Sequence, residues 1–240
     1  MVKYSYMMID LGSIIIPLLF SFHPKVRLYR HWDCLIPGIV IVAAFYALWD
    51  SWFVHLGIWG FNPAYLTGLH IGNLPLEELL FFICIPYACL FTFSCLSGHF
   101  STNLIRRITG WINYILLALL FALSLIFFAK PYTSSAFIFL GVLVVAAIVS
   151  KPLWLPKFYP VYLVLLIPFL VVNGLLTGTG LSHPVVWYSQ AGIIGLRVFT
   201  IPVEDFFYGM GLILANVWIY RWLRSRQRKR NSFADRGVNI

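Results

Sequence analysis

The chain has 240 residues, of which 61% are apolar and only 10% are charged, and its mean hydropathy is +0.87. This composition excludes an ordinary soluble domain and predicts an all-α integral membrane protein. The net charge of +9 does not indicate nucleic-acid binding, because the basic residues lie in short loops and in the segment 221–230 rather than over one globular face. The four cysteines form no CxxC pair, so neither a metal site nor a disulfide framework is expected.

Seven apolar stretches approach the length of about 20 residues that a helix needs to cross the hydrocarbon core of a bilayer. In chain order they cover residues 4–22, 35–53, 76–96, 111–128, 134–150, 158–176 and 202–222. The first is expected to be a membrane helix rather than a cleavable signal, because no small-residue cleavage site follows it. Two long connections, 55–74 and 177–201, are rich in Gly, Trp, Tyr and Pro. We therefore predict seven transmembrane helices with two long aromatic loops.

The positions of lysine and arginine predict the orientation of these helices. Fourteen basic residues fall on one side: Lys25, Arg27, Arg30, Arg106, Arg107, Lys151, Lys157 and the seven within 221–236. The other side has only Lys3, Lys130 and Arg197. Because basic loops stay inside, we expect a multi-pass protein of the cell membrane with its N-terminus outside and its C-terminus in the cytoplasm.

The order of the predicted elements indicates an internal repeat. Two membrane spans, a long aromatic loop and a span that begins with acidic residues occur in that order twice. The prediction is a first three-helix repeat in 1–96, a linker with the fourth helix in 97–133, a second repeat in 134–222 and a basic cytoplasmic tail in 223–240. Three spans are an odd number, and the extra helix gives both repeats the same orientation. The two repeats should then be parallel, related by an axis along the membrane normal.

An acidic doublet begins the last span of each repeat. The phrases are Pro75-Leu76-Glu77-Glu78 and Pro202-Val203-Glu204-Asp205. A carboxylate inside the bilayer costs about 2.5–3.5 kcal/mol on insertion scales and usually has a function. Proline and acidic residues also favour the first turn of any helix. Because apolar residues follow both phrases and the pattern is repeated, we favour the interpretation as a site.

Six of the eight acidic residues should lie in one layer at the outer ends of the helices: Asp10, Asp50 and the two doublets. Adjacent helical residues point about 100° apart, so one acid of each doublet should face the bundle more directly. We expect this inward pair to be Glu77 and Glu204. Arg197 could keep a neighbouring acid ionised, and Asp10 and Asp50 are expected to support the layer.

Aromatic side chains surround this predicted layer, among them Phe81, Phe206 and Tyr208. Most of them fit an interfacial belt and core packing. Aromatic faces also stabilise a positive charge, and a carboxyl in apolar surroundings can stay neutral and ready to donate a proton. Together these groups would suit protonation of an alkene and guidance of the resulting carbocation. Asn62, in Asn62-Pro63, could bond to a carboxylate or form an Asn-Pro turn, and the turn is the simpler interpretation.

Two segments carry a family resemblance: Trp59-Gly60-Phe61-Asn62-Pro63-Ala64-Tyr65-Leu66-Thr67-Gly68, and Leu74-Pro75-Leu76-Glu77-Glu78-Leu79-Leu80-Phe81-Phe82. With the second doublet, they resemble the membrane-integral lycopene cyclase family, whose members have two homologous three-helix domains, fused or separate. The resemblance implies a lycopene β-cyclase that converts ψ-ends to β-ionone rings without net redox change and gives β-carotene or γ-carotene.

The resemblance also implies the site and the partners. The catalytic acids would come from Glu77, Glu78, Glu204 and Asp205, and the supporting or substrate-binding residues would be Asp10, Asp50, Asn62, Phe81, Arg197, Phe206 and Tyr208. No redox cofactor or metal is implied. The partners would be the lipid-soluble carotenoid, membrane lipids and other carotenoid enzymes.

Some alternatives remain open at this point. The second half lacks the Asn-Pro-x-Tyr phrase of the first, so the two halves could have unequal roles. Relatives with this architecture also cyclise longer C50 carotenoids. A proton-coupled transporter would use intramembrane carboxylates as well, although usually near the midplane. A retinal protein is disfavoured, because the span 202–222 has no lysine for a Schiff base.

Overall fold

The computed structural model describes residues 3–100 and 103–237, with side chains described up to residue 230. The described part is mostly helical. Its α-helices are α1 (Ser5–Phe20), α2 (Trp32–His55), α3 (Leu76–Leu96), α4 (Asn103–Ile126), α5 (Pro131–Ser150), α6 (Leu155–Leu176) and α7 (Val203–Gly237). Two short 3-10 helices, η1 (Leu28–His31) and η2 (Pro63–Tyr65), lie in the connections.

These helices agree with the predicted all-α membrane class, and several limits differ from the prediction. Among the described residues, five segments are long and apolar enough to cross a membrane, namely η1 with α2 and the four helices α3 to α6. Helix α1 is apolar but shorter. Helix α4 begins at Asn103, eight residues before the predicted start. Helix α5 begins at Pro131 rather than 134, because proline fits the first turn, where its missing N–H loses no bond.

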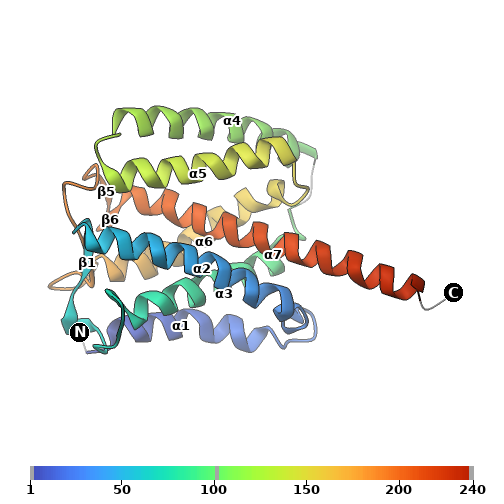
Figure 1. Cartoon of the computed structure of the whole chain (residues 1–240), viewed down its shortest axis with the longest axis horizontal. Coiled ribbons are helices and arrows are strands. Elements are labelled where there is room, and N and C mark those ends of the chain that lie inside the picture. Colours follow the sequence, from blue (N-terminus) through green and yellow to red (C-terminus); the bar gives the residue numbers. More distant parts are fainter. Residues whose placement is uncertain (1–2, 101–102, 238–240) are drawn as a thin grey trace.

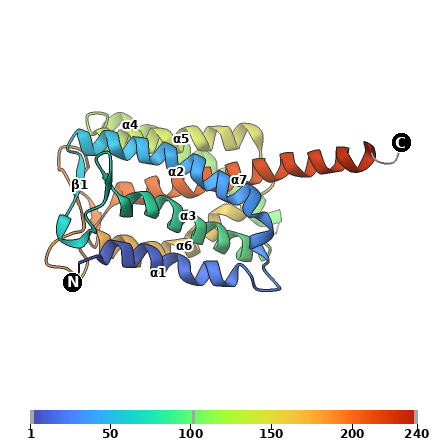
Figure 2. The same ribbon diagram turned by 60° about the horizontal axis from the view of Figure 1, so that its bottom comes forward.

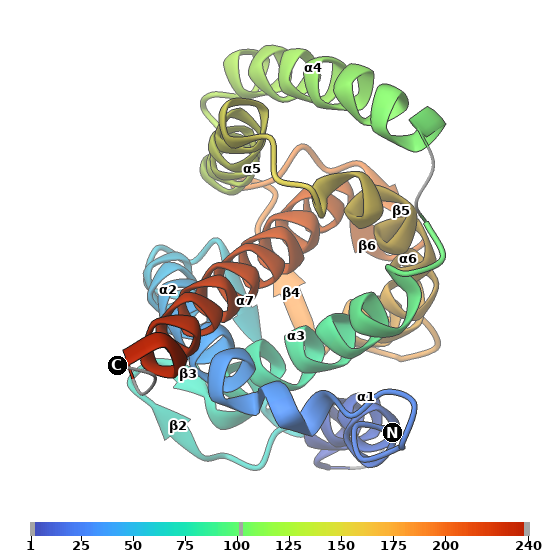
Figure 3. The same ribbon diagram turned by 90° about the vertical axis from the view of Figure 1, so that its right-hand side faces the viewer.

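The helices form one bundle whose axes run along the long dimension of the molecule (Figure 1). Helix α7 packs against α2, α3 and α5, and α1 packs on α3. Helix α4 lies at the outside, beside α5 (Figure 3). The N-terminal end and the loop strands lie at one end of the bundle, whereas α7 extends well beyond the other end (Figure 2). Both acidic doublets therefore begin their helices at the same end.

Short strands connect the two long loops, a feature that the all-α prediction did not include. Strand β1 (Trp59–Phe61) pairs antiparallel with β4 (Val186–Tyr188). A hairpin of β2 (His70–Ile71) and β3 (Leu74–Pro75) precedes α3, and a hairpin of β5 (Arg197–Val198) and β6 (Ile201–Pro202) precedes α7. Gly60 pairs with Trp187, whose ring lies 2.4 Å from where a Cβ on Gly60 would be, so this close approach needs glycine. The pairing joins the two long loops that precede the acidic doublets.

Hydrogen bonds between tyrosines and other helices hold the interior of the bundle. Tyr46 donates its hydroxyl to the backbone oxygen of Tyr208 at 3.3 Å, and Tyr162 donates to that of Phe206 at 2.6 Å. Tyr159 also donates to Asn113 on α4. Lipid tails are as apolar as the side chains that they would replace, so packing and such bonds are what select one arrangement of the helices.

Candidate active site

Each acidic doublet is placed by the hairpin that comes before it. The first backbone N–H of α3, on Leu76, donates to Leu69 O at 2.9 Å, and that of α7, on Val203, donates to Leu196 O at 3.0 Å. The preceding residues, Pro75 and Pro202, end the hairpins, and prolines there need no backbone acceptor. The two helix starts therefore have the same local geometry in both halves.

The first acid of each doublet turns back to its own loop. Glu77 Oε1 accepts the backbone N–H of Thr67 at 2.6 Å, and Glu204 Oε1 accepts that of Ile194 at 2.7 Å, ten residues upstream in both cases. Glu204 also accepts the hydroxyl of Thr133 at 2.6 Å. The prediction that Glu77 and Glu204 form the inward pair differs from this geometry. Loop N–H groups at a buried site need acceptors, and these carboxyls supply them.

The second acid of the second doublet, Asp205, faces the interior and accepts three hydrogen bonds. Tyr132 donates to Oδ1 at 2.7 Å, while Asn173 and Tyr188 donate to Oδ2 at 2.8 and 3.0 Å. Asp205 itself is 4% exposed. Burial, followed by the neighbouring Asp205 carboxyl, raises the pKa of the loop residue Tyr188 well above its ordinary value, so its hydroxyl remains a neutral donor. Both oxygens of Asp205 are therefore filled by donors.

The second acid of the first doublet, Glu78, belongs to a different arrangement. Tyr6 donates to Glu78 Oε2 at 2.6 Å, and Tyr208 donates to Asp50 Oδ1 at 2.6 Å. The carboxyls of Glu78 and Asp50 are close neighbours within the buried layer. Two buried carboxyls side by side repel each other when both are ionised, so a proton on one of them is favoured. This pair is built to hold a proton.

Asp10 lies next to this pair on α1 and has an unusual environment. Its side chain is 0% exposed, and neither carboxyl oxygen has a hydrogen-bond partner within the described residues. Its charged neighbours are Glu78 and Glu77. A buried carboxyl without partners is costly unless it stays neutral. Asp10 thus lies in the predicted acidic layer, but its carboxyl makes no hydrogen bond to the other described acids of the layer.

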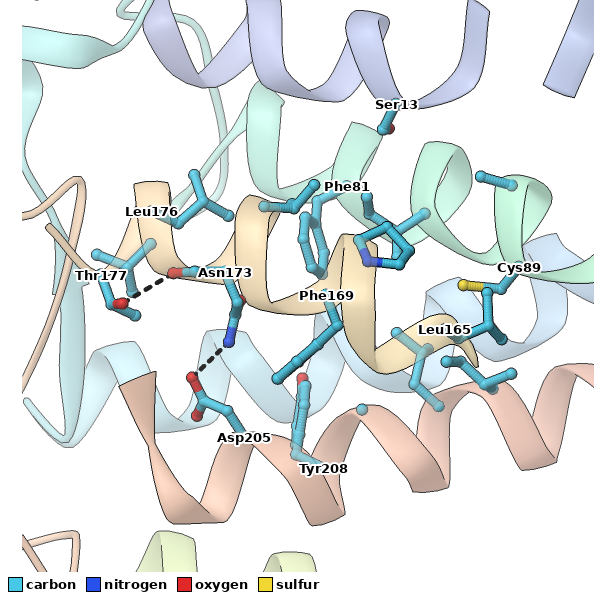
Figure 4. Close-up of a pocket in the computed structure, with 18 of the residues that line it drawn as sticks. Ser13, Phe81, Cys89, Leu165, Phe169, Asn173, Leu176, Thr177, Asp205 and Tyr208 are labelled. Atoms are coloured by element: carbon cyan, nitrogen blue, oxygen red, sulfur yellow. Dashed lines mark hydrogen bonds between the residues drawn. The ribbon is translucent and has the colours of Figure 1, made fainter. Parts of the chain in front are cut away.

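A cavity of about 270 Å³ reaches this layer from within the bundle, between α1, α3, α6 and α7. Figure 4 shows Asn173 and Asp205 at one end of it, with Leu165 and Cys89 toward the other. The polar end is lined by Tyr6, Asp50, Tyr132, Asn173, Tyr188, Asp205 and Tyr208, and apolar walls come from Phe81, Ile85, Leu165, Phe169 and Leu212. The arrangement is an apolar chamber that ends at ionisable groups.

The remaining predicted site residues have varied positions. Phe81 and Tyr208 line the cavity. Phe206 packs its ring 4.9 Å from that of Phe169, which lines the cavity. Asn62 accepts the N–H of Ala64 at 3.1 Å and begins η2, which is the turn interpretation.

Arg197 does not hold a carboxylate in the described part of the chain. Its guanidinium donates to the backbone oxygen of Thr200 and lies 5.8 Å from the ring centre of Tyr188. Tyr188 in turn bonds to Asp205. Arg197 is exposed, so the expected direct contact with an acid is replaced by an indirect one through an aromatic ring.

Sequence reasoning missed three residues that bond to the inner acids: Tyr6, Tyr132 and Asn173. Tyr188 is one of the aromatic residues expected around the acidic layer, but its bond to Asp205 was not predicted. Asn173 had a usable signal, because a polar amide within the apolar run Val171-Val172-Asn173-Gly174 is unusual in a membrane helix. Tyr6 and Tyr132 had none, since tyrosine is common where helices meet the membrane surface.

Comparison with known families agrees with this geometry. The model of the family described as lycopene cyclase matches residues 3–96 and 129–223, and each matched segment contains one acidic doublet. Searches of curated proteins and of solved structures found no match. The two matched segments together span more than half of the sequence. The chain therefore belongs to the lycopene cyclase family, a family of enzymes that act on carotenoids.

Proposed function

We propose that the protein is an integral membrane lycopene β-cyclase, which converts the acyclic ψ-ends of lycopene to β-ionone rings. The observation that carries the proposal is the apolar, aromatic-walled cavity that ends at Asp50 and Asp205. Its volume of about 270 Å³ suits one end of a long polyene rather than the whole molecule. Family membership supports a carotenoid as the substrate.

The reaction begins with proton transfer. A carboxyl at the polar end of the cavity gives its proton to the terminal double bond of the ψ-end, which leaves a tertiary carbocation. The next internal double bond attacks this cation and closes a six-membered ring. A carboxylate then removes a proton from the ring, and the electrons of that C–H bond become the ring double bond. One proton is added and one is lost, so the product is an isomer of the substrate.

The walls of the cavity suit a cationic intermediate. Trp59, Phe81 and Tyr208 line it and present aromatic rings, whose negative faces attract a positive charge. The rings of Trp59 and Tyr132 are 4.8 Å apart, and those of Tyr46 and Tyr208 are also 4.8 Å apart, so the walls are packed firmly. A dry, rigid chamber keeps water from capturing the cation before the ring closes.

Access from the bilayer is supported by the side chains at the margin of the cavity. Ser13 and Pro17 on α1, and Phe169 and Val172 on α6, line the cavity and are half-buried at the surface of the bundle. A lipid-soluble polyene would enter here, with one end reaching the acids. The remainder of the substrate would stay between the helices and the lipid.

The proposed topology has all seven helices crossing the membrane, the N-terminus outside and the C-terminus in the cytoplasm. The excess of basic residues in the loops and tail assigned to the cytoplasmic side supports this orientation. Glu77 and Glu204 each lie in the first turn of a helix that follows a hairpin, and each accepts a hydrogen bond from the backbone N–H ten residues upstream. This shared local geometry supports two parallel repeats. The acidic layer would then lie toward the outer face.

The test is pigment analysis in a host that accumulates lycopene and expresses this chain alone. Bicyclic β-carotene, or monocyclic γ-carotene, is the expected product. Unchanged lycopene with a folded, membrane-inserted protein would contradict the proposal. In that case a host that accumulates a C50 carotenoid would decide between a longer substrate and proton-coupled transport.

A further inference from the structure

We propose that the acids at the cavity have opposite roles: the Asp50–Glu78 pair supplies the proton that starts ring closure, and Asp205 is the base that ends it. This assignment rests on the proposed cyclase function and gives a direction to its proton transfer. It follows from the hydrogen bonds around each acid, which differ in the number and kind of donors.

Asp205 is surrounded only by donors. Asn173 offers an amide N–H, and Tyr132 and Tyr188 offer hydroxyls, so three donors meet two carboxyl oxygens. An ionised carboxylate is acceptor-only and uses all three, whereas a protonated one would turn its own hydrogen toward a donor. The geometry therefore fits an ionised Asp205. A carbocation loses its proton easily, so even a weakly basic carboxylate suffices as the base.

The Asp50–Glu78 pair contains a contact that needs a proton of its own. Each acid receives one tyrosine hydroxyl, from Tyr208 and Tyr6. Two such buried carboxyls side by side cannot both be ionised at low cost, so the pair holds a proton. Asp50 is the member that lines the cavity, whereas Glu78 is not among the lining residues. Asp50 is thus placed to present the proton to an alkene.

The proton balance of a turnover follows from these positions. The O–H bond at the pair breaks as a C–H bond forms at the less substituted carbon of the terminal double bond, and after ring closure Asp205 takes a proton from a ring carbon. Asp205 then returns its proton to water at that end of the bundle, and the pair regains one. No net proton, electron or co-reactant is consumed.

The experiment compares Asp50→Asn with Asp205→Asn as purified proteins in lipid vesicles supplied with lycopene. Removal of a general acid costs about 10²–10⁴ in rate, so Asp50→Asn should leave lycopene unchanged. Asp205→Asn should still protonate the substrate. Its cation would lose a proton from another carbon or capture water, so the products would shift from β-rings toward other ring isomers and tertiary alcohols. A purely structural role would lower the yield without changing the products.

Tyr188→Phe and Tyr208→Phe form a matched pair that keeps the aromatic ring and removes one hydroxyl donor, to Asp205 and to Asp50 respectively. Tyr188→Phe should change the mixture of products, and Tyr208→Phe should slow turnover with the wild-type product. Tyr188→Phe also decides the question if Asp205→Asn does not fold.

Two results would overturn the assignment. One is ring formation by Asp50→Asn within about tenfold of the wild-type rate, well above the loss that removal of a general acid causes. The other is wild-type product, or none at all, from folded Asp205→Asn. If Asp205→Asn does not fold, a wild-type product mixture from Tyr188→Phe overturns it instead. Wild-type protein that closes no ring would contradict the cyclase function itself, which is a separate failure.

Discussion

The geometry of the first doublet predicts that neighbouring glutamates respond differently to the same substitution. Glu77 accepts the N–H of Thr67 at 2.6 Å and does not line the cavity, whereas Glu78 belongs to the proton-holding pair. Glu77→Gln keeps an oxygen acceptor for the loop. A hydrogen bond to a charged group contributes about 1.5–3 kcal/mol and a neutral one about 0.5–1.5, so the variant should lose about 1–1.5 kcal/mol of unfolding free energy.

Activity separates the two positions. Glu77→Gln should retain cyclisation within about tenfold of wild type, because the Thr67 N–H keeps an oxygen acceptor and Glu77 does not line the cavity. Glu78→Gln removes a proton-holding group and should lose at least about a hundredfold. Glu77→Leu leaves the Thr67 N–H without its acceptor, at a cost of about 1–3 kcal/mol, and should have the lowest melting midpoint of the three.

The assay pairs thermal unfolding in detergent, followed by tryptophan fluorescence, with product formation from lycopene in vesicles. The melting midpoint should be highest for wild type, lower for Glu77→Gln and lowest for Glu77→Leu. The reasoning would be refuted if Glu77→Gln were as inactive as Glu78→Gln while its melting midpoint equalled that of wild type. Glu77 would then act in the chemistry rather than in the loop.

Three further predictions concern the cavity, the outer cation and the loop pairing. Ala88→Trp places a large side chain on the cavity wall and should abolish cyclisation with normal membrane insertion. Leu48→Trp, at a 74% exposed position, is the control, and equal activity of the two variants would show that the substrate does not use this cavity. Arg197→Gln removes an exposed contact to an aromatic ring worth about 0.5–1 kcal/mol, so product formation should fall by no more than about fivefold, and complete loss would show a direct role in the reaction. Gly60→Ala brings a Cβ to 2.4 Å from the Trp187 ring and should lower the melting midpoint, because overpacking costs about 1–3 kcal/mol. Gly12→Ala, with open space around the new Cβ, should not lower it, and equal midpoints of the two variants would mean that the β1–β4 pairing is not tight.

The acidic layer could be predicted from the sequence because carboxyls are rare in apolar helices. Each of the six acids could be located at a helix end by counting residues from the span limits. The choice within each doublet could not be made this way. Helical geometry states only that Glu77 and Glu78 point in different directions, and the loop N–H of Thr67, which comes from ten residues upstream, decides which of them turns away.

The long loops were the least predictable part of the fold. Their pairing through β1 and β4 joins residues more than 120 positions apart, and strands of three residues leave no periodic signal. The early start of α5 also hid two residues of the site from prediction. With Pro131 in the first turn, Tyr132 and Thr133 become helical and reach Asp205 and Glu204, although both lie before the predicted span. The division of the chain into two repeats and a linker stays a prediction.

Single-turnover cyclisation in deuterium oxide tests the central claim most directly. Purified protein in vesicles would be equilibrated in deuterium oxide, supplied with less lycopene than protein, and its product analysed by mass spectrometry. Proton-initiated cyclisation predicts one deuterium in the product for each ring closed, because the carboxyl proton that starts each closure has exchanged with the solvent. Rings without deuterium, or recovery of lycopene alone, would contradict the account.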